Sequence, residues 1–459
     1  TFAVCGSFIM RFFGFDLPSL QIAGGLVVAH SGFSMLENKR RSTNEEDQHA
    51  TAKADVSFSP MALPLIAGPG SIGVVIALAA RNTAIGFHVG IILGIAVTAA
   101  VIALLLRYGT PWIDKLGATG VGAIVRIMGF LILVIGGGGG AYLLLAPNFA
   151  PARGTAYVYI RPDDTFDGLC RQLTDSAGCR QMETFRLAAR ALRYADRRMP
   201  TGRYAVRPGM NNLDLLLDLR RGNQSPVRIT FQNVRLKHDL SERLADQLMV
   251  DAPAIESLLD DSTYCANLGF TPETIKAMFI PNTYEVYWNI PADKLLRRMK
   301  REYDAFWTEA RRNRAEQIRL TPVEVSILAS IVEEESAIPD EYPTIAGLYL
   351  NRLYRGMLLQ ADPTVKYAVG DFALQRILDR HKEVDSPYNT YLYPGLPPGP
   401  LRVPSITAID AVLHHAQHDY IYMCAREDFS GRHNFASTLA EHNQNALRYR
   451  QELNRRGIY

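Results

Sequence analysis

The sequence predicts a multi-domain protein in which an α-helical membrane segment precedes a soluble α+β region. Two observations divide the 459 residues in this way. The first 146 residues contain long apolar runs separated by short charged clusters, which is the pattern of membrane-spanning helices. Beyond residue 150, charged residues are frequent and strand-like runs alternate with helical patterns. We predict four parts with the boundaries 1–146, 150–235, 236–320 and 321–459.

Composition restricts the partners of this chain. A net charge of +3 gives no support for nucleic-acid binding. The five cysteines include no CxxC pair, so neither a zinc site nor a thioredoxin-like site is indicated. Cys170 and Cys179 can pair if they lie outside the cytoplasm, but their spacing does not establish a disulfide. The chain begins at Thr1 inside an apolar run, so we expect the true N-terminus to be missing.

Four apolar segments follow the opening run, at about 18–36, 59–80, 85–106 and 127–146. Each has about 20 residues, enough to cross a hydrocarbon layer ~30 Å thick. The first and third loops between these segments are rich in lysine and arginine, whereas the second contains only Arg81. Positive-inside counting therefore places the two richer loops in the cytoplasm and the chain beyond residue 147 in the periplasm.

The apolar run ALPLIAGPGSI is broken by Gly68, Pro69 and Gly70. Irregular backbone at membrane depth is buried in protein or lines a cavity, and a packing kink is the simpler alternative. With RFFGFDLPSLQIAGGLVV before it and GATGVGAIVRIMG after it, this motif resembles the MarC family of multi-pass inner-membrane proteins over about 1–135. The resemblance implies a membrane segment, truncated at its N-terminus, and no defined transport activity. The glycine run 136–140 interrupts the last segment and is interpreted as a junction between two gene products.

The part from 150 to 235 is predicted to be a small α/β module. Its runs YVYI (157–160) and VRITF (227–231) are typical of strands, and helical patterns lie between them. Its signals resemble those of a glycan-binding LysM-like unit. Residues 236–320 are predicted to be a helical connecting region. They include the turn-rich FIPNTYEVYWN, whose aromatic residues are expected to fill a core or, alternatively, to flank a sugar site.

A helix is predicted from Thr321 to Glu335. Thr321 can cap its N-terminus, Pro322 suits its first position, and Glu324 can close a capping box. Apolar residues then recur at helical spacing at 327, 328, 331 and 332, and the next position of this stripe is Glu335. The helical angle therefore directs Glu335 inward, with Glu334 to one side and Glu333 nearly opposite the stripe.

The inward direction gives Glu335 a chemical role. A carboxyl group among apolar neighbours loses solvation of its charged form, so its pKa rises and it stays protonated near neutral pH. A protonated carboxyl group is what a general acid needs to donate a proton to a leaving oxygen. The alternative is that EEE is only the solvated end of an ordinary helix, as charge runs usually are.

The remaining candidates lie in two loops and near the C-terminus. The stretch SPYNTYLYPGLPPGPLRVPS (386–405) is too rich in proline and glycine for a helix, so we expect an ordered surface loop. Asn amides pair with hydroxyls and Tyr rings stack on sugar faces, which suits a polar, ring-shaped ligand. His414, His415 and His418 approach metal spacing on a predicted helix, but no further ligand set accompanies them, so no metal is predicted. For the C-terminal His433, Asn434, His442 and Asn443, hydrogen bonds to a substrate or to the acid compete with simple structural capping.

Together, ILASIVEEES, GMLLQADPTVKYAVG, SPYNTY, GLPPGP and RHNFASTLAEHN resemble the endolytic murein transglycosylase family (YceG-like, MltG), over about 150–459. In that family the catalytic acid is the second glutamate of an E-x-E pair. The resemblance therefore implies that Glu335 is the catalytic acid and that Glu333 is its companion. It also implies a mixed catalytic domain over 321–459, with no metal and no cofactor. The expected substrate-binding residues are Glu333, Gln360, Asp362, Thr364, Tyr388, Asn389, Thr390, His433, Asn434 and Asn443.

The activity implied by this resemblance is cleavage of the β-1,4 bond between N-acetylmuramic acid and N-acetylglucosamine in nascent strands, leaving a 1,6-anhydro end. One carboxyl group suffices, because the sugar's 6-hydroxyl replaces the attacking water of most glycosidases. Two alternatives remain: a hydrolytic muramidase in which Asp362 or Glu333 activates water, and a non-enzymatic wall scaffold that docks glycan on 386–400. Expected partners are peptidoglycan strands, membrane lipid and cell-wall synthases, at the inner membrane with the catalytic region in the periplasm.

Overall fold

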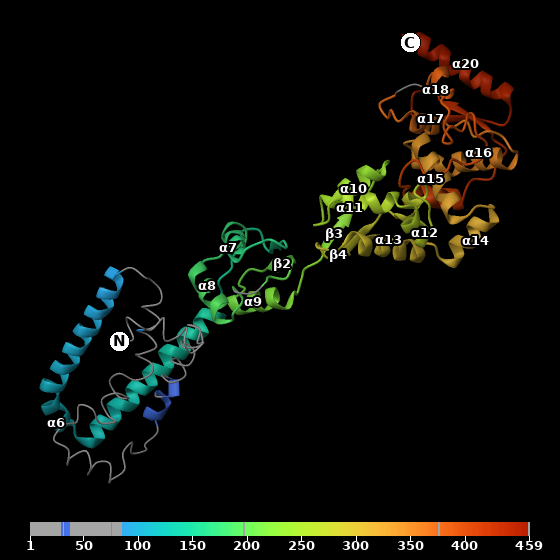
Figure 1. The fold of residues 1–459 in the computed structure, drawn as a ribbon. Helices are drawn as coiled ribbons and strands as arrows, with labels where there is room; N and C mark the ends of the chain where they lie inside the picture. The colour runs from blue at the N-terminus through green and yellow to red at the C-terminus, as the bar shows by residue number, and fades with distance from the viewer. Residues whose placement is uncertain are drawn as a thin grey trace. The chain divides into compact units, whose positions relative to one another are not determined.

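The computed structural model describes residues 29–30, 32–36, 75, 85–195, 198–374 and 377–457. The chain forms two compact units (Figure 1). The first unit comprises Thr1–Val158, Thr165–Met199 and Val206–Arg221. The second unit comprises Tyr159–Asp164, Pro200–Ala205 and Gly222–Tyr459, and it contains every candidate site residue predicted above.

In the first unit, the apolar helix α6 (Ile85–Leu145) contains two stretches long and apolar enough to cross a membrane. These stretches, Val89–Gly109 and Thr119–Leu145, agree with the predicted segments 85–106 and 127–146. A kink at Gly117 separates them, and its φ of 60° lies in the left-handed region that favours glycine. The other two predicted segments, with the Gly-Pro-Gly motif, lie largely outside the described residues.

The prediction that the glycine run 136–140 interrupts the last apolar segment is wrong, because α6 continues through it. Each glycine weakens a helix by about 1 kcal/mol relative to alanine. Within a hydrocarbon layer, however, an unpaired backbone group costs several kcal/mol, so an unbroken helix is still favoured there. The glycines therefore do not end the segment.

A small α/β module follows α6. Its sheet pairs β1 (Ala156–Ile160) with β2 (Gly202–Val206), so the strand predicted at 157–160 is confirmed. The run predicted at 227–231 does not join this sheet. It forms β3 (Val227–Thr230), which is antiparallel to β4 (Thr283–Val286) in the second unit. The helices of the module are α7 (Phe166–Asp175), α8 (Met182–Ala191) and α9 (Asn212–Arg221).

The part of the second unit before residue 320 is mainly helical, as predicted, although it also contains β4. Its aromatic stretch divides in two: Tyr284 and Trp288 are buried in the core, whereas Tyr287 is 56% exposed. The helices of this part are α10 (Lys237–Ala245), α11 (Ala252–Asp260), α12 (Ser262–Asn267), η1 (Ile275–Met278), α13 (Ala292–Phe306) and α14 (Glu309–Gln317).

The helix α15 (Pro322–Glu335) lies at the centre of the C-terminal part and contacts helices on several sides. The predicted capping box is present: the Thr321 hydroxyl accepts from Glu324 N at 3.2 Å, and the Glu324 carboxylate accepts from Thr321 N at 2.7 Å. Every residue from 325 to 332 is buried, so the expected single apolar stripe is wrong. A helix surrounded by neighbours buries its whole circumference.

The elements around α15 complete the second unit. They are η2 (Pro339–Glu341), α16 (Tyr342–Tyr354), α17 (Asp362–Val369), α18 (Asp379–Lys382), α19 (Ile406–Leu413), β5 (Tyr422–Ala425), β6 (His433–Ala436) and α20 (Leu439–Arg455). The strands β5 and β6 form an antiparallel pair in which Cys424 lies opposite Asn434. One continuous apolar core joins α15, α16 and α19 to the helices before residue 320.

Candidate active site

Glu335 is the last residue of α15, and its side chain is partly buried. The packing of α16 against α15 brings Tyr349 to it, and the Tyr349 hydroxyl donates a hydrogen bond to Glu335 Oε1. Tyr349 itself is only 2% exposed. The carboxyl group therefore has one fixed hydrogen-bond donor, which comes from a rigid helix.

Burial raises the pKa of Glu335 to about 8. The hydrogen bond from Tyr349 opposes this shift, because it stabilises the carboxylate. The negative charges of Asp362 and Glu334 add to the rise. Glu335 is therefore mostly protonated at neutral pH, as a general acid must be.

The two preceding glutamates lie in ion pairs. Arg235 donates two hydrogen bonds of 3.0 and 2.7 Å to the Glu334 carboxylate, and Arg402 donates a third of 3.1 Å to the same group. Glu333 accepts a hydrogen bond of 2.8 Å from the Ser405 backbone, and Arg402 Nε lies 3.9 Å from it. Their side chains are only 11–12% exposed, so the run of glutamates is not a solvated helix end. Among the described residues, Glu335 alone of the three has no cationic partner.

A buried lysine fixes the chain around both of these arginines. Lys276 Nζ donates to the carbonyl of Arg235 at 2.9 Å and to that of Leu401 at 3.4 Å. It also lies 3.0 Å from the Tyr367 hydroxyl. Burial lowers the pKa of Lys276 to about 7. Since Leu401 directly precedes Arg402, this lysine positions both chain segments that hold the glutamate pair.

A second carboxylate lies near the acid. Asp362 is the first residue of α17, is exposed, and is close enough for its charge to raise the pKa of Glu335. The Tyr391 hydroxyl donates to Asp362 Oδ1 at 2.6 Å. Burial raises the pKa of Tyr391, so this hydroxyl keeps its proton. Asp362 therefore presents a carboxylate with a fixed orientation at the mouth of the site.

Gln360 lies beside Asp362 and is exposed. Its φ of 51° is left-handed, which is unfavourable for a residue with a side chain. The conformation is held by a hydrogen bond from Gln360 N to the Thr390 carbonyl at 3.1 Å and by one from Arg352 to the side-chain oxygen. Arg352 is buried and also donates to two backbone carbonyls.

Three of the predicted recognition residues lie in the interior. Thr364, Asn389 and Thr390 are at most 1% exposed. The hydroxyls of Thr364 and Thr390 are 2.8 Å apart, and Asn389 donates to the carbonyls of Lys382 and Val384 at 2.8 Å each. These side chains anchor the loop 386–405 to α17 and α18. The third predicted residue of this loop, Tyr388, is half-buried against Tyr367, with ring centroids 4.7 Å apart.

A buried carboxylate links β6 to the residue that follows the acid. Glu341 is 6% exposed and accepts from His433 N at 2.9 Å. Its Oε2 lies 3.0 Å from His433 Nδ1 and accepts from the Ser336 hydroxyl at 3.1 Å. The chain leaving Glu335 is thus fixed by Ser336, Glu341 and His433. Asn434 instead donates to Glu427 at 2.7 Å, and Asn443 is exposed on α20.

Metal binding finds no support in the part of the chain that the structure describes, where no three His, Cys, Asp or Glu side chains gather. The prediction that His414, His415 and His418 share a helix is wrong, because α19 ends at Leu413. Cys170 and Cys179 are free thiols, and burial raises the pKa of Cys170 to about 11.

Tyr349 and Glu341 contact the site and were missed by the sequence reasoning. Tyr349 lies on the helical pattern of YPTIAGLYLNRLY, where an aromatic residue is indistinguishable from ordinary core. Two features of the sequence could have indicated Tyr349: it lies four residues after Ile345 in a helical pattern, and that pattern directly follows the helix that ends in Glu335. Glu341 carries no such signal, because its partner His433 is 92 residues away.

Comparison with known proteins covers both parts of the chain. Residues 158–448 match the YceG-like family, and residues 1–138 match the MarC family of integral membrane proteins. An endolytic murein transglycosylase of Bacillus subtilis is 28% identical over 54% of this chain and 72% of its own length. One of Streptococcus pneumoniae is 26% identical over 58% of this chain and 53% of its own length.

The remaining comparisons concern the membrane part and the solved structures. The UPF0056 membrane protein YvbG of Bacillus subtilis is 33% identical over 31% of this chain and 70% of its own length. A crystal structure of a yceG-like protein from Listeria monocytogenes is 24% identical, with a TM-score of 0.43, and covers 64% of this chain and 99% of that chain. This chain therefore belongs to the YceG-like family, and its first 138 residues belong to the MarC family of integral membrane proteins.

Proposed function

We propose that this chain is a membrane-anchored peptidoglycan lytic transglycosylase in which Glu335 is the general acid and base. The observation that carries the proposal is the Glu335 carboxyl, which is partly buried, accepts a hydrogen bond from Tyr349 and has a pKa raised by burial to about 8. Membership of the YceG-like family and the names of the related transglycosylases support the choice of murein as substrate.

The reaction needs only one carboxyl group. The Glu335 proton passes to the glycosidic oxygen between N-acetylmuramic acid and N-acetylglucosamine as the C1–O4 bond breaks. The 6-hydroxyl oxygen of the same muramic acid then bonds to C1, and its proton passes to the Glu335 carboxylate. The proton count is restored, no water is consumed, and the product carries a 1,6-anhydro end.

The neighbours of Glu335 suit both halves of this cycle. Before cleavage, the Asp362 and Glu334 charges favour the protonated acid. After proton transfer, the Tyr349 hydroxyl stabilises the new carboxylate. The Asp362 carboxylate is also proposed to stabilise the positive charge that develops on the sugar.

Substrate contacts are proposed for Gln360, Asp362, Tyr388 and His433, whose side chains are exposed or partly exposed. Thr364, Asn389 and Thr390 are proposed to act indirectly, by holding the loop 386–405 in place. Glu333 is proposed to act through its contacts with Arg402 and Ser405, which fix the end of α15. For Asn434 and Asn443 we propose weaker, peripheral contacts with a long strand.

A hydrolytic muramidase is the second candidate, because Asp362 provides a second carboxylate near the acid. In that reaction Asp362 would take a proton from water, and the product would carry one water more than the anhydro product. Mass spectrometry of the muropeptides distinguishes the two outcomes directly.

The cellular setting is also part of the proposal. Positive-inside counting and the MarC-family membership support a multi-pass segment in the inner membrane with the soluble unit in the periplasm. In that setting the unit meets membrane lipid, wall polymer and the synthases that extend it. The module after α6 is proposed to bind glycan.

The test is digestion of isolated peptidoglycan by the full chain in detergent micelles. We expect anhydro ends from the parent chain and a loss of at least about 1000-fold in rate for Glu335→Gln, since the general acid is removed. Glu316→Gln, an exposed glutamate on α14, is the matched control and should retain full activity. Retained cleavage by Glu335→Gln would contradict the assignment.

A further inference from the structure

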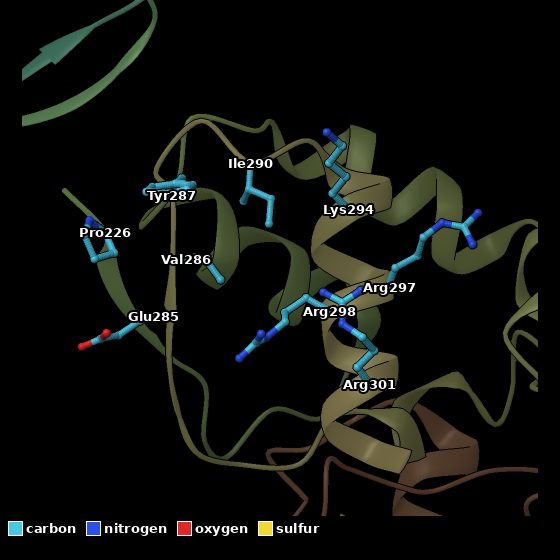
Figure 2. Close-up of a pocket in the computed structure, with 9 residues that line it drawn as sticks. All are labelled: Pro226, Glu285, Val286, Tyr287, Ile290, Lys294, Arg297, Arg298 and Arg301. Carbon is cyan, nitrogen blue, oxygen red and sulfur yellow. The ribbon is translucent and has the colours of Figure 1, made fainter. Parts of the chain in front are cut away.

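A hollow of about 680 Å³ lies between the end of β4 and the helix α13, within the second unit (Figure 2). Val286 and Ile290 give it an apolar side, and the exposed ring of Tyr287 lies at its edge. None of the residues that contact Glu335 lines it. It is therefore a separate feature from the candidate active site.

The cations of this hollow come from one helical face. Lys294, Arg298 and Arg301 follow the i, i+4, i+7 spacing of one face of α13, and all three line the hollow. Neither Lys294 nor Arg301 forms an ion pair with any residue that the structure describes. Arg297 also lines the hollow and pairs with Asp293 at 2.8 Å, and Glu285 contributes one carboxylate. The lining as a whole therefore carries a net positive charge.

Arg298 is the third of these cations, and it is already paired with a glutamate of its own helix. Its Nη2 lies 2.6 Å from Glu302, but its Nε is buried and forms no hydrogen bond within the described part of the chain. Figure 2 shows the Arg298 side chain extending from α13 toward the strand side of the hollow.

The shape and chemistry of the hollow select among anions. Cations beside an apolar side fit a small ligand that carries carboxylates on a short aliphatic chain. A flat lipid surface would instead contact protruding side chains rather than a concavity. Arginine is also the side chain best suited to carboxylate recognition.

We propose that this hollow binds the carboxylates of the short peptides that muramic acid carries in peptidoglycan, an inference that rests on the proposed function. Contacts of α13 and of α15 with η1 place the hollow and Glu335 in one folded body. A strand held at Glu335 carries many such peptides, so one of them bound at the hollow adds to the affinity of the whole strand.

The test uses the full chain with Glu335→Gln in detergent micelles, so that binding is measured without cleavage. Sedimentation gives its affinity for intact sacculi, and competition by the soluble peptide-free strands that an amidase releases gives its affinity for bare glycan. We expect about tenfold tighter binding to intact sacculi, and the preference should shrink as salt rises. Lys294→Gln/Arg301→Gln should abolish the preference. Arg312→Gln/Arg314→Gln on α14 makes the same charge change and should keep it.

A direct titration with L-alanyl-γ-D-glutamyl-meso-diaminopimelate gives an independent measurement. Binding to the parent that disappears in Lys294→Gln/Arg301→Gln and weakens in Arg298→Gln supports the proposal. Equal affinity of the parent for intact sacculi and for peptide-free strands, or a preference retained by the double variant, overturns it. The proposal is also overturned if the parent chain binds vesicles of anionic phospholipid through the hollow but does not bind the peptide. Failure of the proposed function would be seen in two other results. The parent chain would have no affinity for peptide-free glycan, and it would not cleave peptidoglycan.

Discussion

Glu333, Glu334 and Glu335 occupy one helical turn, yet each carboxyl group meets different neighbours. Arg402 lies within ion-pair distance of the first two, and Arg235 also pairs with Glu334. For Glu335, burial and the charges of two further carboxylates favour the protonated form, whereas the hydrogen bond from the Tyr349 hydroxyl opposes it. The protonation state of the acid is therefore set by which side chains surround it, rather than by helix position alone.

Replacing Tyr349 tests this account at the active carboxyl. The fraction of protonated Glu335 falls as pH rises through about 8, so the rate of cleavage should decline above that pH. Tyr349→Phe removes a hydrogen bond that lowers the pKa of Glu335, so the midpoint of the decline should move upward by about one unit. The maximal rate should also fall by about tenfold, because the carboxylate formed during cleavage loses its donor.

The control is Tyr354→Phe on the same helix, whose hydroxyl donates to the Ile318 carbonyl at 2.8 Å. Its pH profile should match that of the parent chain. A midpoint that stays in place or moves to lower pH in Tyr349→Phe would show that the tyrosine does not act on the ionisation of Glu335.

At the scale of elements, α15 connects the loop 386–405 to the acid. Ser330, in the buried middle of α15, accepts a hydrogen bond from Leu401 N at 2.9 Å. The next residue, Arg402, reaches Glu334 and Glu333 at the end of the same helix. The helix therefore fixes both the position of the loop and the environment of its own last turn.

Ser330→Ala should destabilise the second unit by about 1–3 kcal/mol, because the buried Leu401 N–H loses its acceptor. The free energy of unfolding, measured by denaturant titration of the full chain in micelles, gives this value. Ser257→Ala on α11 removes an exposed hydroxyl and should change it by less than about 0.5 kcal/mol. Equal effects of the two substitutions would mean that the bond to Leu401 contributes nothing.

Local features of the elements could be predicted from sequence, whereas their surroundings could not. The capping box at Thr321 depends on residues three positions apart, so its pattern is visible in the sequence. The inward turn of Glu335 was inferred from an apolar stripe, although α15 is buried on all sides. Arg235 and Arg402 lie 99 and 68 residues from Glu334, and no local periodicity reports contacts across such separations.

At the scale of the whole molecule, two families meet in one chain. The MarC-family part provides the apolar stretches Val89–Gly109 and Thr119–Leu145, and the YceG-like part provides the candidate active site. The hydropathy of both stretches was evident from sequence because it needs no tertiary partner. The pairing of β3 with β4 was not, because it joins strands more than fifty residues apart.

The order of these parts predicts the topology of the chain. Only Thr119–Leu145 separates Lys115 from the soluble part, so the two must lie on opposite sides of the membrane if this stretch spans it. A cysteine introduced by Glu316→Cys, an exposed site, should therefore react with a membrane-impermeant maleimide on intact spheroplasts. A cysteine introduced by Lys115→Cys should react only after permeabilisation. The parent chain, whose native cysteines are buried or half-buried among the described residues, gives the background.

Labelling of both variants on intact cells would show that Thr119–Leu145 does not cross the membrane. Labelling of Lys115→Cys alone would place the catalytic unit in the cytoplasm, away from any wall polymer, and so exclude the proposed function.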